Sequence, residues 1–121
     1  MRTFYDRGVA FDTKRWENSV LSDSHINERI VVANPKHVEI LRQGVETFNA
    51  WREENPKVIP NLEGAFFINK SLQKANLSRA VLDGTQFQGS NLRYARFQGS
   101  CILEANFRDC DLRNTNLSDT R

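Results

Sequence analysis

Large apolar residues recur at every fifth position through the second half of the chain. The stretch "ANLSRAVLDGTQFQGSNLRYARFQG" (75–99) carries Leu or Phe at each fifth place, and this register runs unbroken through twelve positions. These positions are Leu62, Phe67, Leu72, Leu77, Leu82, Phe87, Leu92, Phe97, Ile102, Phe107, Leu112 and Leu117. An α-helix would spread a period of five around its circumference, and a strand would place successive members on opposite faces. We therefore predict that the chain turns within every repeat, so that each large side chain enters the same interior.

A column of mostly small residues lies two places before each large residue, and only Pro60 and Lys70 depart from it. Because a lysine cannot stay charged and unpaired in a core, we expect an irregular first coil that lets the Lys70 side chain extend outward under the cap. Glycine adopts strained corner conformations at the least cost. The predicted corners two places after a large residue include Gly64, Gly84, Gly89 and Gly99.

These repeats resemble the pentapeptide-repeat family, whose pattern is A-(D/N)-L-x-x. The nearest matches are "ANLSR" (75–79), "SNLRY" (90–94), "ANFRD" (105–109) and "TNLSD" (115–119). The resemblance implies a mainly β fold, a right-handed quadrilateral β-helix with four repeats in each coil and about three coils in all. Positions twenty apart would then stack, and Phe67, Phe87 and Phe107 would form one interior ladder.

A capping segment is predicted at residues 34–57, ahead of the repeats. Asn34 and Pro35 suit the start of a helix over residues 35–54, and Asn55 followed by Pro56 suits its end. An apolar stripe on this helix is expected to cover the first coil. The stripe consists of Val38, Leu41, Val45, Phe48 and Trp51. Similar segments precede the repeats in bacterial pentapeptide-repeat proteins.

Three segments are therefore expected along the chain. Residues 1–33 form an N-terminal extension, with short strands predicted at "VAFD" and "RIVVA". Residues 34–57 form the cap, and residues 58–121 form the repeat β-helix. The total length of 121 residues fits a single small domain with a decorated end.

Composition and charge restrict the function classes. Residues 1–60 hold nine Lys/Arg and nine Asp/Glu, and residues 61–121 hold eight and six, so neither half has the excess of a nucleic-acid arm or an acidic tail. No apolar run approaches a membrane span, and the N-terminus lacks the apolar core of a signal peptide. With only two cysteines, we expect reduced thiols and a cytoplasmic location.

No residues are spaced as a catalytic, cofactor-binding or metal-binding set, so we expect no enzyme, no cofactor and no metal. His25 and His37 have no His or Cys at metal-ligand spacing and are predicted as surface residues. Cys110 lies in the small inward column, whereas Cys101 lies outward and is the more accessible thiol. A disulfide between them is disfavoured, because nine residues would place them on different sides of a coil.

A non-enzymatic protein–protein interaction or scaffold module is the favoured function. One candidate contact face consists of Val81, Cys101 and Leu103, which are outward apolar residues where the repeat normally has polar ones. One alternative is DNA mimicry, as in the pentapeptide proteins that protect DNA gyrase from quinolones. We disfavour mimicry because it needs a long acidic rod, whereas these repeats carry a net charge of +2 and form a short stack.

Direct nucleic-acid binding is another alternative, through arginines that stack or flank one another. They are Arg93, Arg96, Arg108 and Arg113. Only Tyr94 accompanies them, so the aromatic platforms of single-strand binders are absent from the pattern.

The last coil is predicted to be an association surface through Phe107, Leu112 and Leu117. The residues after Leu117, "SDTR", are too short to form a cap. Known relatives close this end with a C-terminal helix or by end-to-end dimerisation. We therefore expect a weak homodimer through this end, or another protein bound to it.

Overall fold

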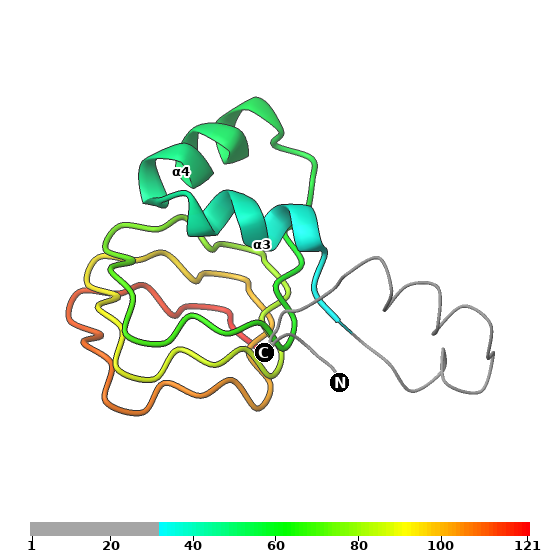
Figure 1. The fold of residues 1–121 in the computed structure, drawn as a ribbon. Coiled ribbons are helices and arrows are strands. Elements are labelled where there is room, and N and C mark those ends of the chain that lie inside the picture. The colour runs from blue at the N-terminus through cyan, green and yellow to red at the C-terminus, as the bar shows by residue number, and fades with distance from the viewer. Residues whose placement is uncertain (1–31) are drawn as a thin grey trace, which may run out of the picture. The chain divides into compact units, whose positions relative to one another are not determined.

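The computed structural model describes residues 32–121, and Ala33–Arg121 form one compact unit (Figure 1). Helix α3 spans Pro35–Arg42, helix α4 spans Val45–Glu54, and the repeats follow as a stack of coils (Figure 1). The strands predicted at "VAFD" and in most of "RIVVA" lie outside the described residues, so they stay predictions.

The single helix predicted over residues 35–54 is wrong, because the structure has two helices there. Asn34 caps α3 as expected, since its side chain accepts a hydrogen bond from the backbone N–H of Lys36 at 2.9 Å. The helix ends at Arg42 with Gln43 as its C-cap, and Gly44 follows with φ of 127°. This backbone conformation suits glycine and interrupts the helix, so the chain turns before α4 begins.

Successive coils of the repeats meet through isolated parallel bridges between residues twenty positions apart. Asn61 bridges Val81, and Val81 bridges Cys101, and the same spacing recurs in every other bridge. Twenty residues are four repeats, so residues twenty apart form a row that runs down the stack. A turn in every repeat leaves single bridging residues instead of strands, and no extended strand occurs in residues 32–121.

Each repeat turns through a residue with positive φ, two places after its large residue. The four glycines predicted at corners have φ of 70° to 74°, which confirms their placement. Non-glycine residues hold φ of 56° to 67° at the corners of the other repeats. The backbone N–H after the corner donates to the carbonyl of the large residue, as Ala65 does to Leu62 at 3.0 Å. A positive φ with this hydrogen bond is characteristic of a type II turn.

The interior contains the predicted ladder of aromatic rings. Phe67 and Phe87 stack with ring centroids 6.2 Å apart, and Phe87 and Phe107 stack at 5.3 Å. Phe97, half a coil away, meets Phe87 and Phe107 edge-on at 6.1 and 5.6 Å. Offset stacking and edge-to-face contacts are both favourable arrangements of aromatic rings. The five-residue register therefore identified the core of the stack correctly.

Two polar members of the small inward column, Thr85 and Ser90, find hydrogen-bond partners in the preceding coil. Thr85 Oγ1 donates to the carbonyl of Leu62 at 2.8 Å, and Ser90 Oγ donates to that of Phe67 at 2.5 Å. Both residues are almost completely buried. Because a buried hydroxyl without a partner is costly, these bonds explain how Ser and Thr can replace Ala in the interior.

Candidate interaction surfaces

The described residues offer no assembled chemical centre. Within residues 32–121, no cluster of His, Cys, Asp or Glu is suited to hold a metal ion, and no helix is long and apolar enough to cross a membrane. His25 lies outside this part of the chain.

His37 was predicted as a surface residue, and the structure places it half-buried within the cap. Its Nδ1 accepts a hydrogen bond from the backbone N–H of Asn61 at 2.9 Å, and its ring lies 4.9 Å from that of Trp51. Burial lowers the pKa of His37, which favours the neutral imidazole that this acceptor role requires. Asn61 lies twenty-four residues away, and no local motif indicates this contact.

The apolar stripe of the two helices covers the first coil. Leu41 and Phe48 are buried within the same core cluster as the large residues of the repeats. Val38, Val45 and Trp51 are partly buried against that cluster. All five residues predicted as cap contacts therefore lie at this end of the stack.

Polar side chains of α4 pair with backbone groups of the first coil. Asn49 Nδ2 donates to the carbonyl of Lys74 at 3.0 Å, and Asn49 Oδ1 accepts from the N–H of Asn76 at 2.8 Å. Arg52 Nη1 donates to the carbonyl of Asn76 at 2.6 Å. The N–H and carbonyl of Asn76 would bond to a preceding coil if one existed, as those of Arg96 do one coil later, so Asn49 and Arg52 take its place. The sequence reasoning missed both residues.

Arg52 is only 6% exposed, which is unusual for an arginine. Burial lowers its pKa, and the positive charges of Arg79 and Arg96 lower it further. Its position in the last turn of α4 and its bond to a backbone carbonyl offset part of this cost. The side chain therefore has a structural role at the capped end.

Helix α3 and the residue before it cover two more places on the first coil. The backbone N–H of Asn34 donates to the carbonyl of Asn61 at 2.9 Å. Arg42 Nη2 donates to the carbonyl of Phe66 at 3.1 Å, and its guanidinium lies 5.2 Å from the centre of the Phe67 ring. Arg42 is exposed while making these contacts.

The last coil has no comparable cover among residues 32–121. Phe107 and Leu112 are half-buried, and Leu117 is 41% exposed. Several backbone groups on this edge have no partner within the described residues. They are the N–H groups of Phe107, Leu112 and Leu117 and the carbonyls of Ala105, Cys110 and Thr115. The predicted association surface therefore combines apolar side chains with an open backbone edge.

The predicted contact face at Val81, Cys101 and Leu103 is uneven. Val81 and Cys101 bridge each other in one row, and both are half-buried. Leu103 is 67% exposed, the highest value for a large apolar residue in the described part of the chain. Its backbone N–H donates to Asp83 Oδ1 at 2.8 Å, which fixes the backbone that presents it. Leu103 is thus the protruding member of this face.

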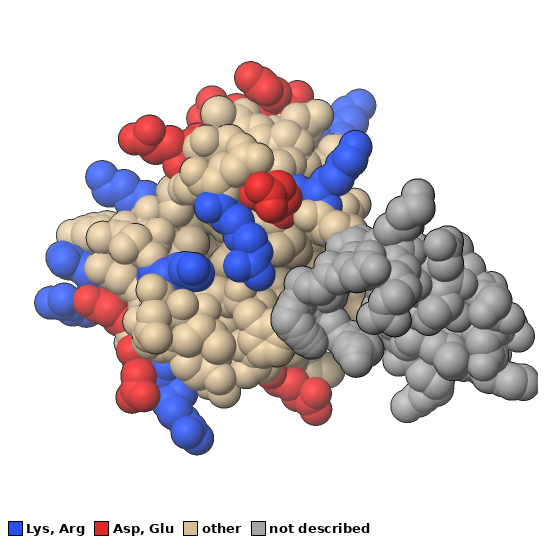
Figure 2. All heavy atoms as spheres, in the orientation of Figure 1, with Lys and Arg blue, Asp and Glu red and all other residues tan. Residues whose placement is uncertain are grey.

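The four arginines considered for nucleic-acid binding do not lie along one side of the stack. Arg93 and Arg113 share a row, whereas Arg108 lies in the repeat before Arg113 and Arg96 lies in the repeat after Arg93. Basic and acidic side chains are interspersed over the face seen in Figure 2. The arrangement lacks the continuous basic stripe that phosphate backbones require.

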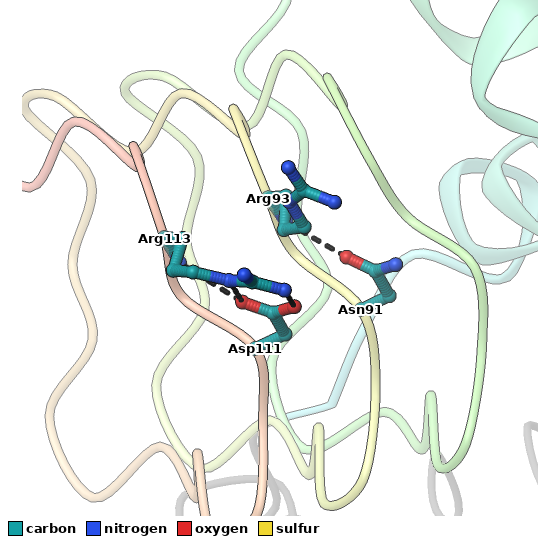
Figure 3. Close-up of polar contacts among 4 residues, drawn as sticks. All are labelled: Asn91, Arg93, Asp111 and Arg113. Carbon is teal, nitrogen blue, oxygen red and sulfur yellow. Dashed lines mark hydrogen bonds and ion pairs between the residues drawn. The ribbon is translucent and has the colours of Figure 1, made fainter.

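One arginine of the shared row is neutralised within the coil. Arg113 Nη2 lies 2.7 Å from Asp111 Oδ2, and Arg113 Nε donates to Asp111 Oδ1 at 2.9 Å (Figure 3). The hydrogen bond from Arg113 lowers the pKa of Asp111 to about 2. One coil earlier, Asn91 replaces the carboxylate and accepts only the backbone N–H of Arg93, at 3.1 Å (Figure 3).

Both cysteines are free thiols and both are half-buried. Cys110 Sγ lies 2.9 Å from the carbonyl of Phe87, in the same inter-coil arrangement as Thr85 and Ser90. Burial raises the pKa of Cys110, so its thiolate is disfavoured. Cys110 therefore acts as a small inward residue, as its column predicted, although the open last coil leaves it incompletely covered.

A family comparison accounts for the repeated half of the chain. The family model described as Pentapeptide repeats (8 copies) matches residues 61–93, 71–109 and 90–121, which together cover half of the 121 residues. The chain belongs to the pentapeptide-repeat family. A search of curated proteins finds no match. In this pentapeptide-repeat protein α3 and α4 lie outside the matched residues, so the cap is the part that the family pattern does not describe.

Proposed function

We propose that this pentapeptide-repeat protein is a non-enzymatic protein–protein interaction or scaffold module whose repeats form a right-handed quadrilateral β-helix of about three coils. The twenty-residue spacing of the bridges and the turn in every repeat support four sides in each coil. The right-handed sense follows from the family resemblance. Two free cysteines are consistent with a reducing, cytoplasmic location.

The observation that carries this proposal is the open backbone edge of the last coil. Unpaired N–H and C=O groups beside Phe107, Leu112 and Leu117 form a template on which another chain can pair. We propose that a second copy of this chain binds there about a two-fold axis, because such a contact is self-complementary and closes as a dimer. The cross-section of one coil limits the buried area, so the dimer is weak.

Leu103 supports a second contact face for another protein. A leucine that is 67% exposed and held by a backbone hydrogen bond loses little further backbone entropy when a partner covers it. Val81 and Cys101 extend this apolar surface along the neighbouring row. Cys101 and Leu103 lie in the first repeat of the last coil, whereas Phe107, Leu112 and Leu117 lie in its other three repeats, so substitutions can test the two surfaces one at a time.

Other function classes receive less support. A catalytic role is disfavoured because His37 is used by the cap, and the Cys110 thiol has a raised pKa. DNA mimicry is disfavoured by the net charge of +2 in the repeats, and nucleic-acid binding by the separated positions of the four arginines.

Sedimentation of the full chain over a wide concentration range tests the proposal. We expect a reversible dimer with a dissociation constant on the order of 0.1 mM. Leu117→Asp should abolish the dimer, because it places a charge in the contact. Leu103→Arg is the matched control and should leave the dimer unchanged. A monomer at every concentration, or a dimer lost through Leu103→Arg and kept in Leu117→Asp, would contradict the C-terminal contact.

A further inference from the structure

One side of the first coil is left without a cap. The cap forms hydrogen bonds with Asn61, Phe66 and Asn76, which are the second residues of the first, second and fourth repeats of that coil. Ser71 is the second residue of the third repeat, and neither its backbone N–H nor its carbonyl has a partner in the described residues. This is the one side of the first coil where no described residue replaces the missing preceding coil.

The next coil shows what Ser71 lacks. Asn91 follows Ser71 in the same row, and its N–H donates to the carbonyl of Lys70 at 2.9 Å. The carbonyl of Asn91 accepts from the N–H of Leu72 at 2.8 Å. An extended segment lying on Ser71 would therefore complete the same pair of backbone bonds that joins one coil to the next.

A cavity of 200 Å³ opens at the same place, between the turn that joins α3 to α4 and the first coil. Leu41, Phe67 and Leu72 give it an apolar part, and Arg42 and Lys70 give it two positive charges. No acidic residue lines it. The cavity therefore suits an apolar side chain next to a carboxylate.

Lys70 breaks the small inward column at this corner of the coil. Its side chain is exposed, and neither Lys70 nor Arg42 forms an ion pair within the described residues. The preceding repeat adds two outward apolar residues, Phe66 and Ile68, which are 46% and 39% exposed. The open corner thus carries unpaired backbone groups, apolar surface and uncompensated positive charge together.

We propose that the groove formed by this cavity and the unpaired backbone groups of Ser71 binds an extended peptide segment of a partner protein. Arg42 and Lys70 hold a carboxylate side chain of that segment. The segment adds one strand to the first coil: its carbonyl accepts the N–H of Ser71, and its N–H donates to the Ser71 carbonyl. An apolar side chain of the segment fills the cavity beside Leu72. The groove is at the opposite end of the stack from the proposed dimer contact, so either proposal can fail without the other.

Titration of the full chain with a synthetic peptide tests the groove. The probe is acetyl-Thr-Val-Thr-Glu-Thr-amide, in which Val and Glu lie on the same face of the strand, and its matched control has Gln in place of Glu. We expect the backbone amide resonances of Lys70 and Ser71 to shift, with a dissociation constant on the order of 0.1–1 mM. The Gln peptide should bind about three- to fivefold more weakly, which corresponds to the loss of one solvent-exposed ion pair.

Substitutions assign the charge and the backbone pairing separately. Lys70→Ala restores the ordinary small residue of the column, and it should weaken the Glu peptide about three- to fivefold while leaving the Gln peptide unchanged. Lys74→Ala, at an exposed lysine of the same coil, is the control and should change neither affinity. Ser71→Pro removes the unpaired N–H and should abolish binding of both peptides.

Hydrogen exchange at Ser71 keeps the test decisive if Ser71→Pro fails to fold. The amide should exchange rapidly in the free chain and become protected when the Glu peptide is added. The proposal is overturned by the absence of shifts at Ser71, or by equal affinities for the two peptides. Protection of the Ser71 amide in the free chain also overturns the proposal. If this protection is independent of protein concentration, another segment of the same chain fills the groove. If it rises with concentration, a second copy of the chain fills it. Unchanged peptide affinity in Leu117→Asp would separate this site from the dimer contact.

Discussion

The first and last coils of this protein present the same kind of backbone edge to different surroundings. At the first coil, α3 and α4 bury Leu41 and Phe48 and form hydrogen bonds on three of the four sides. At the last coil, Arg121 pairs with Ser100 and Ile102 on one side, and no residue in the described range 32–121 pairs with the backbone on the other three sides. The aromatic ladder reflects this difference, because Phe67 is 1% exposed whereas Phe107 is only half-buried.

This contrast shows that a stack of repeats cannot pair all the backbone groups of its own end coils. Each repeat supplies backbone partners only to the coils above and below it, so an end coil always keeps unpaired groups. A non-repeating segment such as α3–α4 can satisfy them with side chains used once each, as Asn49 and Arg52 are. An edge that lacks such a segment is available to another chain.

Truncating an aromatic residue at each end should give the largest difference. Phe48→Ala should lower the free energy of unfolding by about 3–5 kcal/mol, because the ring is completely buried between α4 and the first coil. Phe107→Ala should cost about half as much, because part of its ring is already solvated in the native state. Urea unfolding of both variants measures the two losses. Equal losses would mean that the two ends are equally well covered.

Removing the polar part of the cap should have the next largest effect. Asn49→Ala leaves the carbonyl of Lys74 and the N–H of Asn76 without their partners, so we expect a loss of about 1–3 kcal/mol. Hydrogen exchange at the Asn76 amide should accelerate more than exchange at Arg96, one coil further from the cap. Thr47→Ala, at an exposed position of α4, is the control and should change stability by less than about 0.5 kcal/mol.

Corner substitutions in the first and last coils should produce effects of opposite sign. Gly64 and Glu104 occupy the same corner row, with φ of 72° and 62°. A Cβ at Gly64 would meet no atom within 4 Å, so Gly64→Ala should destabilise by only about 1 kcal/mol, the cost of positive φ. Glu104→Gly should remove the same strain, and we expect a gain of up to about 0.5 kcal/mol. Calorimetric melting of both variants checks the signs, and a shared sign would show that backbone strain is not the controlling term.

As the pH falls, the stability that His37 contributes to the cap should be lost before that of the Asp111–Arg113 ion pair in the last coil. Burial lowers the pKa of His37 below 6.5, so the stability that neutral His37 provides is complete above pH 6.5 and is lost as the pH falls through the lowered value. Arg113 lowers the pKa of Asp111 from 3.8 to about 2, so its contribution is lost only as the pH falls from 3.8 toward that value.

The measurement for this smallest effect is a comparison of urea midpoints at about pH 7.5 and about pH 5, near the range in which histidine titrates. The intact chain should lose more stability over this interval than His37→Gln, whereas Asp111→Asn should behave like the intact chain. An identical loss in His37→Gln would remove the link between the cap and acid sensitivity.

Most of the repeat stack was predictable because its signal is local and occurs twelve times. The register of large residues placed Phe67, Phe87 and Phe107 in one ladder, and the glycines after them marked corners that the structure confirms. The apolar stripe of the cap was predictable for a similar reason, since helical spacing brings Leu41 and Phe48 to the same surface. Lys70, one of the two irregularities of the small column, was predicted to extend outward, and it is exposed beside the cavity at this corner.

The sequence by itself therefore determined the period, the interior and the existence of a cover for the first coil. Only the tertiary structure decided how that cover is attached, because each polar contact joins residues more than twenty positions apart and occurs once. Arg52 and Asn76 form no motif, and His37 gives no sign that it accepts a hydrogen bond from Asn61. A periodic pattern occurs many times along the chain, so it can be recognised in the sequence. The pairing of one side chain with one carbonyl occurs once, and it depends on where the chain turns at Gly44.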